Sequence, residues 1–304
     1  MDLIAAFRIF LRVAESGSFS AVAREAGTTQ PAVSRQVSAL EEHLGARLIQ
    51  RTTRSLTLTE EGRALLDHAR RVLDSVEEAE AAVGRGHPVV GGLVRIAAPA
   101  SFGRLYVAPL MPRLMDRHPD LLVELRMSDT TADLVADGLD LALRAGRVGD
   151  AGLVARRIGA SPRQVFASAD YLARNGTPEH PSDLVRHECV IFLQLAAPHD
   201  WRFDGPDGEV AVHVRGRFRT DSSEAVREAV LGGIGVALSP SWMFGDELAT
   251  GQVRAVMGSY RAGQVPIHAV YPTRRHLALR TRTVIDFLAD EFRLDPAISS
   301  YGAA

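Results

Sequence analysis

The sequence contains no lysine, and all 35 basic side chains among its 304 residues are arginines. This absence excludes an enzyme that uses a catalytic or Schiff-base lysine, and it excludes a phosphate-binding GxxxxGK loop. The single cysteine, Cys189, excludes an internal disulfide, an iron–sulfur site and a zinc site built from several cysteines.

Long apolar runs are absent as well. No stretch of about 18 apolar residues occurs, so no transmembrane helix is expected. Arg8 and Arg12 lie inside the first apolar stretch, which is not the order of charge and apolar core in a signal peptide. We therefore expect a cytoplasmic protein without a membrane partner.

Charge divides the chain into three parts. Residues 1–59 hold seven arginines against five acidic residues, and residues 60–84 hold three arginines against seven acidic residues. The remaining 220 residues hold 25 of each. Gly and Pro cluster at residues 84–92, a composition that typically ends a helix and begins a linker. We expect a domain boundary there.

The first part has the pattern of three helices followed by a β-ribbon. Apolar residues at helical spacing predict helices that end near Gly17, Gly27 and Leu44. Two β-type runs, 47–51 and 55–58, follow. The predicted buried face of the third helix consists of Val33, Val37, Leu40 and Leu44.

The third helix presents a polar face without acidic residues at its N-terminal end, as a helix that docks in the major groove of DNA does. Gln can pair with adenine, Arg with guanine, and Ser or Thr can reach phosphate. An arginine at the tip of a ribbon can enter the minor groove or meet phosphates. The candidate DNA-binding residues are Thr29, Gln30, Pro31, Ser34 and Arg35 in the helix, and Arg51 and Arg54 in the ribbon.

Residues 60–84 predict one long helix that Thr59 caps. Its apolar residues are spaced alternately by four and three, which is the seam of a coiled coil. The candidate dimerisation residues are Leu65, Ala69, Val72, Val76, Ala79 and Val83. The alternative is a helix that packs on its own domain.

Residues 92–304 alternate between strand and helix patterns, which predicts a largely parallel sheet with helices on its faces. The predicted strands are 93–97, 121–127, 139–144, 164–167, 189–193, 235–238 and 267–271, and the predicted helices are 103–117, 130–137, 223–231 and 277–292. Residues 201–220 predict a hairpin, and Cys189 is expected to be a buried strand residue.

The N-terminal residues resemble a known family. The stretches 19–26 and 29–41, followed by 44–51 and 58–62, closely resemble the helix-turn-helix of LysR-type transcriptional regulators. The resemblance is nearly continuous over residues 1–65, and it extends more loosely through residues 232–238 to the last helix.

This resemblance implies a mainly α winged helix-turn-helix domain with a long linker helix, followed by an α/β two-lobed effector domain like the type 2 periplasmic-binding proteins. The implied boundaries are 1–59 for the DNA-binding domain, 60–88 for the dimerising helix and hinge, and 89–304 for the effector-binding domain. Lobe I would comprise about 89–163 and 266–304, and lobe II about 164–265.

The implied function is sequence-specific regulation of transcription, modulated by a small-molecule effector bound between the lobes. The implied partners are double-stranded DNA, a small-molecule effector, RNA polymerase and further copies of the chain, as a homodimer or a homotetramer.

The effector is expected at the carboxyl ends of the strands. Helix N-termini, one arginine and aromatic side chains at these ends favour a carboxylate. The candidates are Ser101, Phe102, Asp129, Thr130, Arg144, Phe192, Asp221 and Ser222. Several of these are also ordinary helix caps, which is the alternative.

Three other classes of protein are alternatives. An enzyme is disfavoured because the chain has no HExxH or GxSxG motif and no GxGxxG after a strand. The histidines are scattered, so neither a metal nor a cofactor is expected. A solute-binding protein for transport would need an export signal and would not need residues 1–88. A DNA-binding regulator without an effector is the third alternative.

We predict that Val72→Asp weakens binding to operator DNA more than it weakens folding of the C-terminal domain, because the seam would place two recognition helices on one DNA duplex. Fluorescence anisotropy with operator DNA and thermal unfolding followed by circular dichroism measure the two effects. Unchanged operator affinity in a well-folded variant would contradict pairing through this helix.

Overall fold

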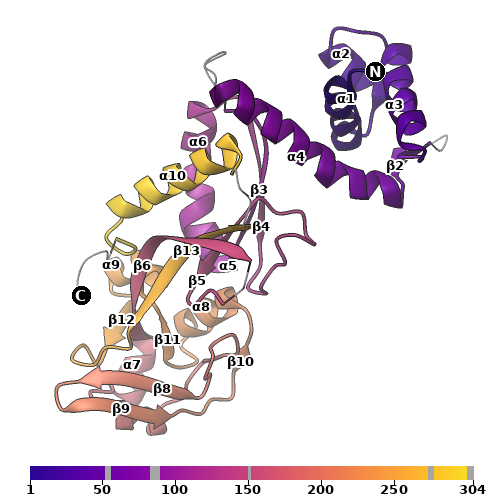
Figure 1. The fold of residues 1–304 in the computed structure, drawn as a ribbon. Helices are drawn as coiled ribbons and strands as arrows, with labels where there is room; N and C mark the ends of the chain where they lie inside the picture. Colours follow the sequence, from indigo (N-terminus) through magenta and orange to yellow (C-terminus); the bar gives the residue numbers. More distant parts are fainter. Residues whose placement is uncertain (52–55, 83–89, 150–151, 273–276, 300–304) are drawn as a thin grey trace. The chain divides into compact units, whose positions relative to one another are not determined.

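The computed structural model divides the chain into two compact units, Met1–Val89 and Val90–Ala304 (Figure 1). It describes residues 1–51, 56–82, 90–149, 152–272 and 277–299. The division falls within the Gly- and Pro-containing segment where the sequence predicts a boundary.

The N-terminal unit consists of four helices and a two-stranded ribbon. In chain order these are α1 (Leu3–Ser16), α2 (Phe19–Glu25), α3 (Gln30–Leu44), β1 (Ile49–Arg51), β2 (Leu56–Leu58) and α4 (Glu60–Ala82). Ser18 caps α2 by accepting a hydrogen bond from the Ala21 amide at 3.2 Å, and Thr59 caps α4 by accepting from the Gly62 amide at 2.9 Å. The predicted helices and the predicted Thr59 cap are confirmed.

Helix α3 is anchored by an apolar stripe and by one buried carboxylate. Val33, Val37 and Leu40 are buried as predicted, whereas Leu44 is 41% exposed because α3 ends there, before the left-handed Gly45. Glu41 is buried, and its carboxylate accepts hydrogen bonds from two main-chain amides at the start of the ribbon. The prediction that Leu44 belongs to the buried face is therefore wrong.

The second unit is built on one curved sheet. Its strands are β3 (Gly92–Ala98), β4 (Leu121–Met127), β5 (Leu141–Ala145), β6 (Leu153–Ser168), β11 (Ala237–Pro240), β12 (Val253–Val256) and β13 (Gln264–Pro272). Their order is β11-β6-β13-β5-β3-β4, and β12 also pairs with β6. Smaller pairs are formed by β7 (Ile191–Phe192) with β10 (Arg219–Thr220), and by β8 (Asp200–Gly205) with β9 (Gly208–His213).

The sheet is mixed, so the prediction of a largely parallel sheet is wrong. Strand β3 pairs in parallel with β4 and β5, but β13 pairs antiparallel with both β5 and β6. Strand β6 is far longer than the predicted strand 164–167, because it continues through Gly159 and Pro162, which usually interrupt a strand. The register of β6 and β13 shifts once, between Ile267 and His268.

Helices cover the sheet as the sequence pattern predicts, with one exception. A continuous helical segment runs through α5 (Ala100–Phe102) and two short turns to α6 (Met111–Arg117), and it is followed later by α7 (Ala169–Asn175), α8 (Ser223–Leu231), α9 (Gly245–Thr250) and α10 (Leu279–Leu294). The predicted helix at 130–137 is wrong. The Asp133 carboxylate accepts hydrogen bonds from the amides of Val135 and Ala136, and Gly138 adopts a left-handed conformation. The segment therefore forms turns.

Cys189 lies just before β7 and is fully buried. Burial raises the pKa of its thiol to about 12, and the nearby Glu188 carboxylate acts in the same direction. A thiol in this environment is inert.

Candidate functional site

The first site is the N-terminal end of α3. Thr29, Gln30, Pro31 and Arg35 are exposed, and Ser34 is half-buried. No acidic residue lies in the first turn. The apolar stripe on the opposite side fixes the helix, so these side chains project from a rigid element, which the geometry of groove binding requires.

The ribbon of β1 and β2 follows α3 directly. Register pairs Arg51 with Leu56, so Arg51 is the last residue of the first strand. The structure describes the backbone of Arg51 but not its side chain, and Arg54 lies outside the described residues. Glu41 holds the base of this ribbon against α3, through hydrogen bonds of 2.9 Å from the Leu48 amide and 3.1 Å from the Ile49 amide.

The apolar stripe of α4 is covered in its first half and more exposed in its second half. Its first half packs on the unit's own core: Ala69 is fully buried and Leu65 packs beside it. Ala69 is thus not presented to a second copy, and here the alternative of own-domain packing holds. Farther along the helix, Val72 is 40% exposed, Ala79 is exposed and Val76 is half-buried. Val83 lies outside the described residues.

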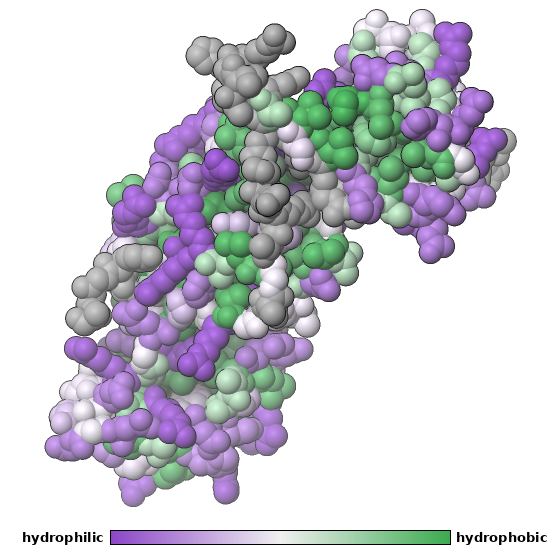
Figure 2. All heavy atoms as spheres, viewed as in Figure 1, coloured by the Kyte–Doolittle hydropathy of each residue, from purple (hydrophilic) through white to green (hydrophobic). Residues whose placement is uncertain are grey.

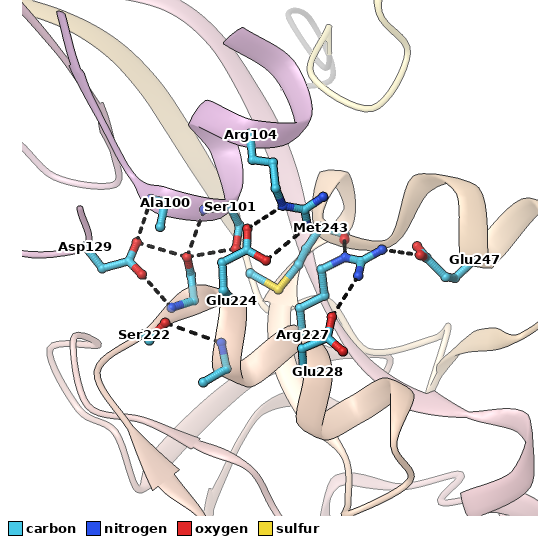
Figure 3. A network of polar contacts seen from close by, with 12 residues as sticks. Ala100, Ser101, Arg104, Asp129, Ser222, Glu224, Arg227, Glu228, Met243 and Glu247 are labelled. Atoms are coloured by element: carbon cyan, nitrogen blue, oxygen red, sulfur yellow. Dashed lines mark hydrogen bonds and ion pairs between the residues drawn. The ribbon is translucent and has the colours of Figure 1, made fainter. Parts of the chain in front are cut away.

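The second site centres on the Asp129 carboxylate, which follows β4 and joins the starts of two helices (Figure 3). It accepts hydrogen bonds from the Ala100 amide at the start of α5 (3.0 Å) and from the Ser223 amide at the start of α8 (2.6 Å). The Ser223 hydroxyl also donates to Asp129 and accepts from the Ser101 hydroxyl. The anion expected at these helix N-termini is therefore part of the chain itself.

A second carboxylate reinforces this junction. Arg104 donates to both oxygens of Glu224 in a bidentate pair, with distances of 2.9 and 3.0 Å. Burial tends to raise the pKa of Glu224, but hydrogen bonds and the positive charge from Arg104 outweigh it, and the pKa is lowered. Glu224 thus stays ionised at neutral pH and ties α8 to the helical segment after β3.

A cavity of about 490 Å³ opens at the carboxyl ends of β3, β4 and β5. Its lining includes Asp129 together with Arg126, Arg144 and Arg147. Arg144 donates to the Ala132 carbonyl at 3.2 Å, and Arg126 pairs with a carboxylate on its own strand. Arg147 is exposed and makes no hydrogen bond or ion pair with any described residue. The cavity therefore has an available guanidinium that can meet an anion.

The structure divides the eight predicted effector residues into two groups. Asp129, Thr130 and Arg144 line the cavity. The others do not: Ser101 and Phe102 are buried, Phe192 packs partly into the core, Ser222 caps α8 and Asp221 is exposed elsewhere. For Phe102 the reason is that its ring packs among Tyr106, Trp242 and Phe292.

Sequence reasoning missed Arg147 and Arg126 in the cavity and Glu41 in the N-terminal unit. The signal for Arg147 was present, since it lies three residues beyond Arg144, just past a strand end. No comparable signal marks Glu41, because an acidic residue near a helix end is usually a solvated one.

Two findings restrict the chemistry of the described residues. No group of three or more His, Cys, Asp or Glu side chains among them is placed to hold a metal ion. No helix within the described ranges has the length and apolar character needed to cross a membrane.

The chain matches two known family models. Residues 4–63 match the model of the bacterial regulatory helix-turn-helix proteins of the LysR family, and residues 88–293 match the model of the LysR substrate binding domain. The chain belongs to the LysR family of transcriptional regulators: it is a DNA-binding regulator with an effector-binding domain. The predicted family and fold class are confirmed, and the named relatives are regulators rather than enzymes.

The relatives match over nearly their full length. The chain is 32% identical to an uncharacterized HTH-type transcriptional regulator of Haemophilus influenzae, over 92% of this chain and 97% of the relative. The solved structure of CrgA from Neisseria meningitidis has 32% identity and a TM-score of 0.62, and covers 94% of this chain and 98% of CrgA. The Vibrio cholerae virulence activator AphB has 28% identity and a TM-score of 0.59, and the match covers 95% of this chain and 99% of AphB.

We predict that Asp129→Ala destabilises the second unit by about 1–3 kcal/mol, because it leaves the amides of Ala100 and Ser223 without their acceptor. Thermal or urea unfolding measures the loss. Asp221→Ala is the matched control, since Asp221 is exposed and accepts no hydrogen bond from a described residue. Equal stability of the two variants would show that the Asp129 junction contributes nothing to folding.

Proposed function

We propose that the chain regulates transcription by binding a specific DNA sequence through the N-terminal turn of α3. The observation that carries this proposal is the acid-free face over a buried apolar stripe, formed by the exposed Gln30, Pro31 and Arg35 with the half-buried Ser34. Arg35 would read a guanine, Gln30 an adenine, and Thr29 would contact phosphate. Arg51 and Arg54 would add contacts from the ribbon.

We infer that two copies pair through the second half of α4. Val72 and Ala79 are exposed apolar residues on the stripe whose first half is already covered, so a second copy would extend the same packing. Two such modules would double the DNA interface and place half-sites about one helical turn (~34 Å) apart, or a multiple of it. A homotetramer would follow from pairing two of these dimers.

We infer that the cavity at the ends of β3, β4 and β5 binds a small carboxylate. Arg147 and Arg144 both line the cavity, which supports recognition of a carboxylate by guanidinium groups. The volume of about 490 Å³ accommodates a small organic acid.

The hydrogen bonds of Asp129 to the starts of α5 and α8 connect the cavity to the rest of the unit. Asp129 lines the cavity and also holds Ser223, which lies in the predicted lobe II. An effector that contacts Asp129 would therefore change how the predicted lobes are held together, to the extent that it binds the two arrangements differently. The regulator would act on RNA polymerase in the cytoplasm, where the chromosome is transcribed.

DNA recognition is tested by fluorescence anisotropy with DNA from upstream of the protein's own gene, in the presence of excess non-specific competitor. We expect Arg35→Ala to lose about 1–3 kcal/mol of binding free energy, the worth of one bidentate base contact. Arg8→Ala, which removes an exposed charge from α1, is the control and should bind like the wild type. Weak, salt-sensitive binding that is the same for all three proteins would refute recognition by α3.

The carboxylate is tested by calorimetry with benzoate and succinate, and with benzamide as the uncharged analogue. We expect at least one acid to bind, and Arg147→Ala to weaken that binding about tenfold through loss of a charged hydrogen bond. Arg113→Ala, remote from the cavity lining, serves as the control. Binding of benzamide without binding of either acid would exclude a carboxylate, and binding of none would favour a regulator without this effector.

A further inference from the structure

A second pocket, of about 600 Å³, lies in the part of the chain between residues 185 and 219. It shares no lining residue with the cavity at the ends of β3, β4 and β5. Four arginines line it, Arg186, Arg215, Arg217 and Arg219, against one carboxylate, Glu188. This concentration of one charge occurs in a chain whose formal net charge is only −2.

Three of these arginines lie on one short segment. The segment 215–220 runs beside 189–193, with the Cys189 amide bonded to the Arg215 carbonyl and the Ile191 amide to the Phe218 carbonyl, and it bends at Arg217. Between these two bonds the segment holds one residue more than its partner, so the pairing is bulged. Arg215, Arg217 and Arg219 are all exposed.

Two residues between the arginines anchor this segment. A Cβ atom on Gly216 would lie 1.6 Å from the Cys189 carbonyl oxygen, so only glycine fits there. Phe218 packs against the main core. These two residues hold the segment in place, so the exposed arginines beside them belong to an anchored part of the fold.

The arginines of the pocket are poorly neutralised. Glu188 is already engaged, since it accepts a hydrogen bond from the Arg217 amide and lies 3.5 Å from the Arg217 Nε atom. The side chains of Arg186, Arg215 and Arg219 make no hydrogen bond or ion pair with any described residue. By contrast, Arg104 and Arg202 of the same unit each pair with a carboxylate.

Three histidines complete the wall, and one of them, His213, is hydrogen-bonded to the Asp200 carboxylate at 2.8 Å. The rings of His199 and His213 stack with their centroids 5.7 Å apart, and both line the pocket. Burial lowers the pKa of His187, which therefore stays neutral at neutral pH and can donate or accept a hydrogen bond. The surface around β8 and β9 is largely hydrophilic on the face shown in Figure 2.

We propose that this pocket is a second ligand site, which binds a small oxyanion with two or more negative charges, either a phosphate ester or a polycarboxylate. Arginine forks match both kinds of group bidentately, and several guanidinium groups in one pocket suit an anion with charge at more than one position. A bound anion also removes the repulsion among the clustered arginines, so it stabilises the folded chain.

The test is calorimetry and thermal unfolding of the full chain with pyrophosphate and, separately, with citrate, at constant ionic strength. We expect one of the two anions to bind and to raise the melting temperature. Arg215→Ala/Arg219→Ala should weaken binding by about tenfold or more, because the loss of a single charged hydrogen bond already costs about that factor. Stronger binding of pyrophosphate identifies a phosphate ester, and stronger binding of citrate identifies a polycarboxylate.

The matched control is Arg254→Ala/Arg261→Ala, which removes two exposed arginines of the same unit that do not line the pocket. It should bind like the wild type. Arg35→Ala tests whether the anion binds at α3, where DNA phosphates are expected to bind, and not in the pocket. The proposal is overturned if neither anion binds, if the two double variants bind equally, or if Arg35→Ala alone abolishes binding.

Discussion

The second unit depends on one carboxylate, that of Asp129. It accepts hydrogen bonds from the first amides of two helices whose starts are more than 100 residues apart in the sequence. Each helix start carries partial positive charge, so the carboxylate balances both at once. The serine pair and the salt bridge between Arg104 and Glu224 are arranged around this contact. Because the same carboxylate faces the cavity, the group that holds the unit together is also the one that an effector would meet.

The elements of the N-terminal unit are likewise joined by a few residues. Glu41 joins α3 to the ribbon through two main-chain amides. Gly62 allows α4 to approach the ribbon closely, because a Cβ atom there would lie 2.1 Å from the Leu48 carbonyl oxygen. Recognition helix, ribbon and linker helix are therefore locked to one another by two residues near Leu48. The polar face of α3 is rigid because its support is rigid.

Local patterns in the sequence predicted local structure well and long-range structure less well. Helix spacing and caps located α2, α3, α4 and α8 correctly, since these depend on neighbouring residues. The mixed sheet could not be predicted, because strand direction depends on pairing partners distant in the chain. The cavity residues Asp129, Thr130 and Arg144 followed from the rule that ligands lie at strand ends. The burial of Phe102 and the capture of helix amides by Asp129 depend on tertiary contacts that no local pattern records.

The pairing of β6 with β13 has a mechanical consequence. Both strands cross the predicted boundary between lobes, near residues 163 and 265, and their register shifts once close to the middle of the pairing. A two-stranded ribbon resists stretching, because that would break its hydrogen-bond ladder, but a bulge allows it to twist. One lobe would then rotate relative to the other about this ribbon, and the two would not separate. Effector binding in the cavity would therefore change the angle between the lobes and leave the distance between them nearly constant.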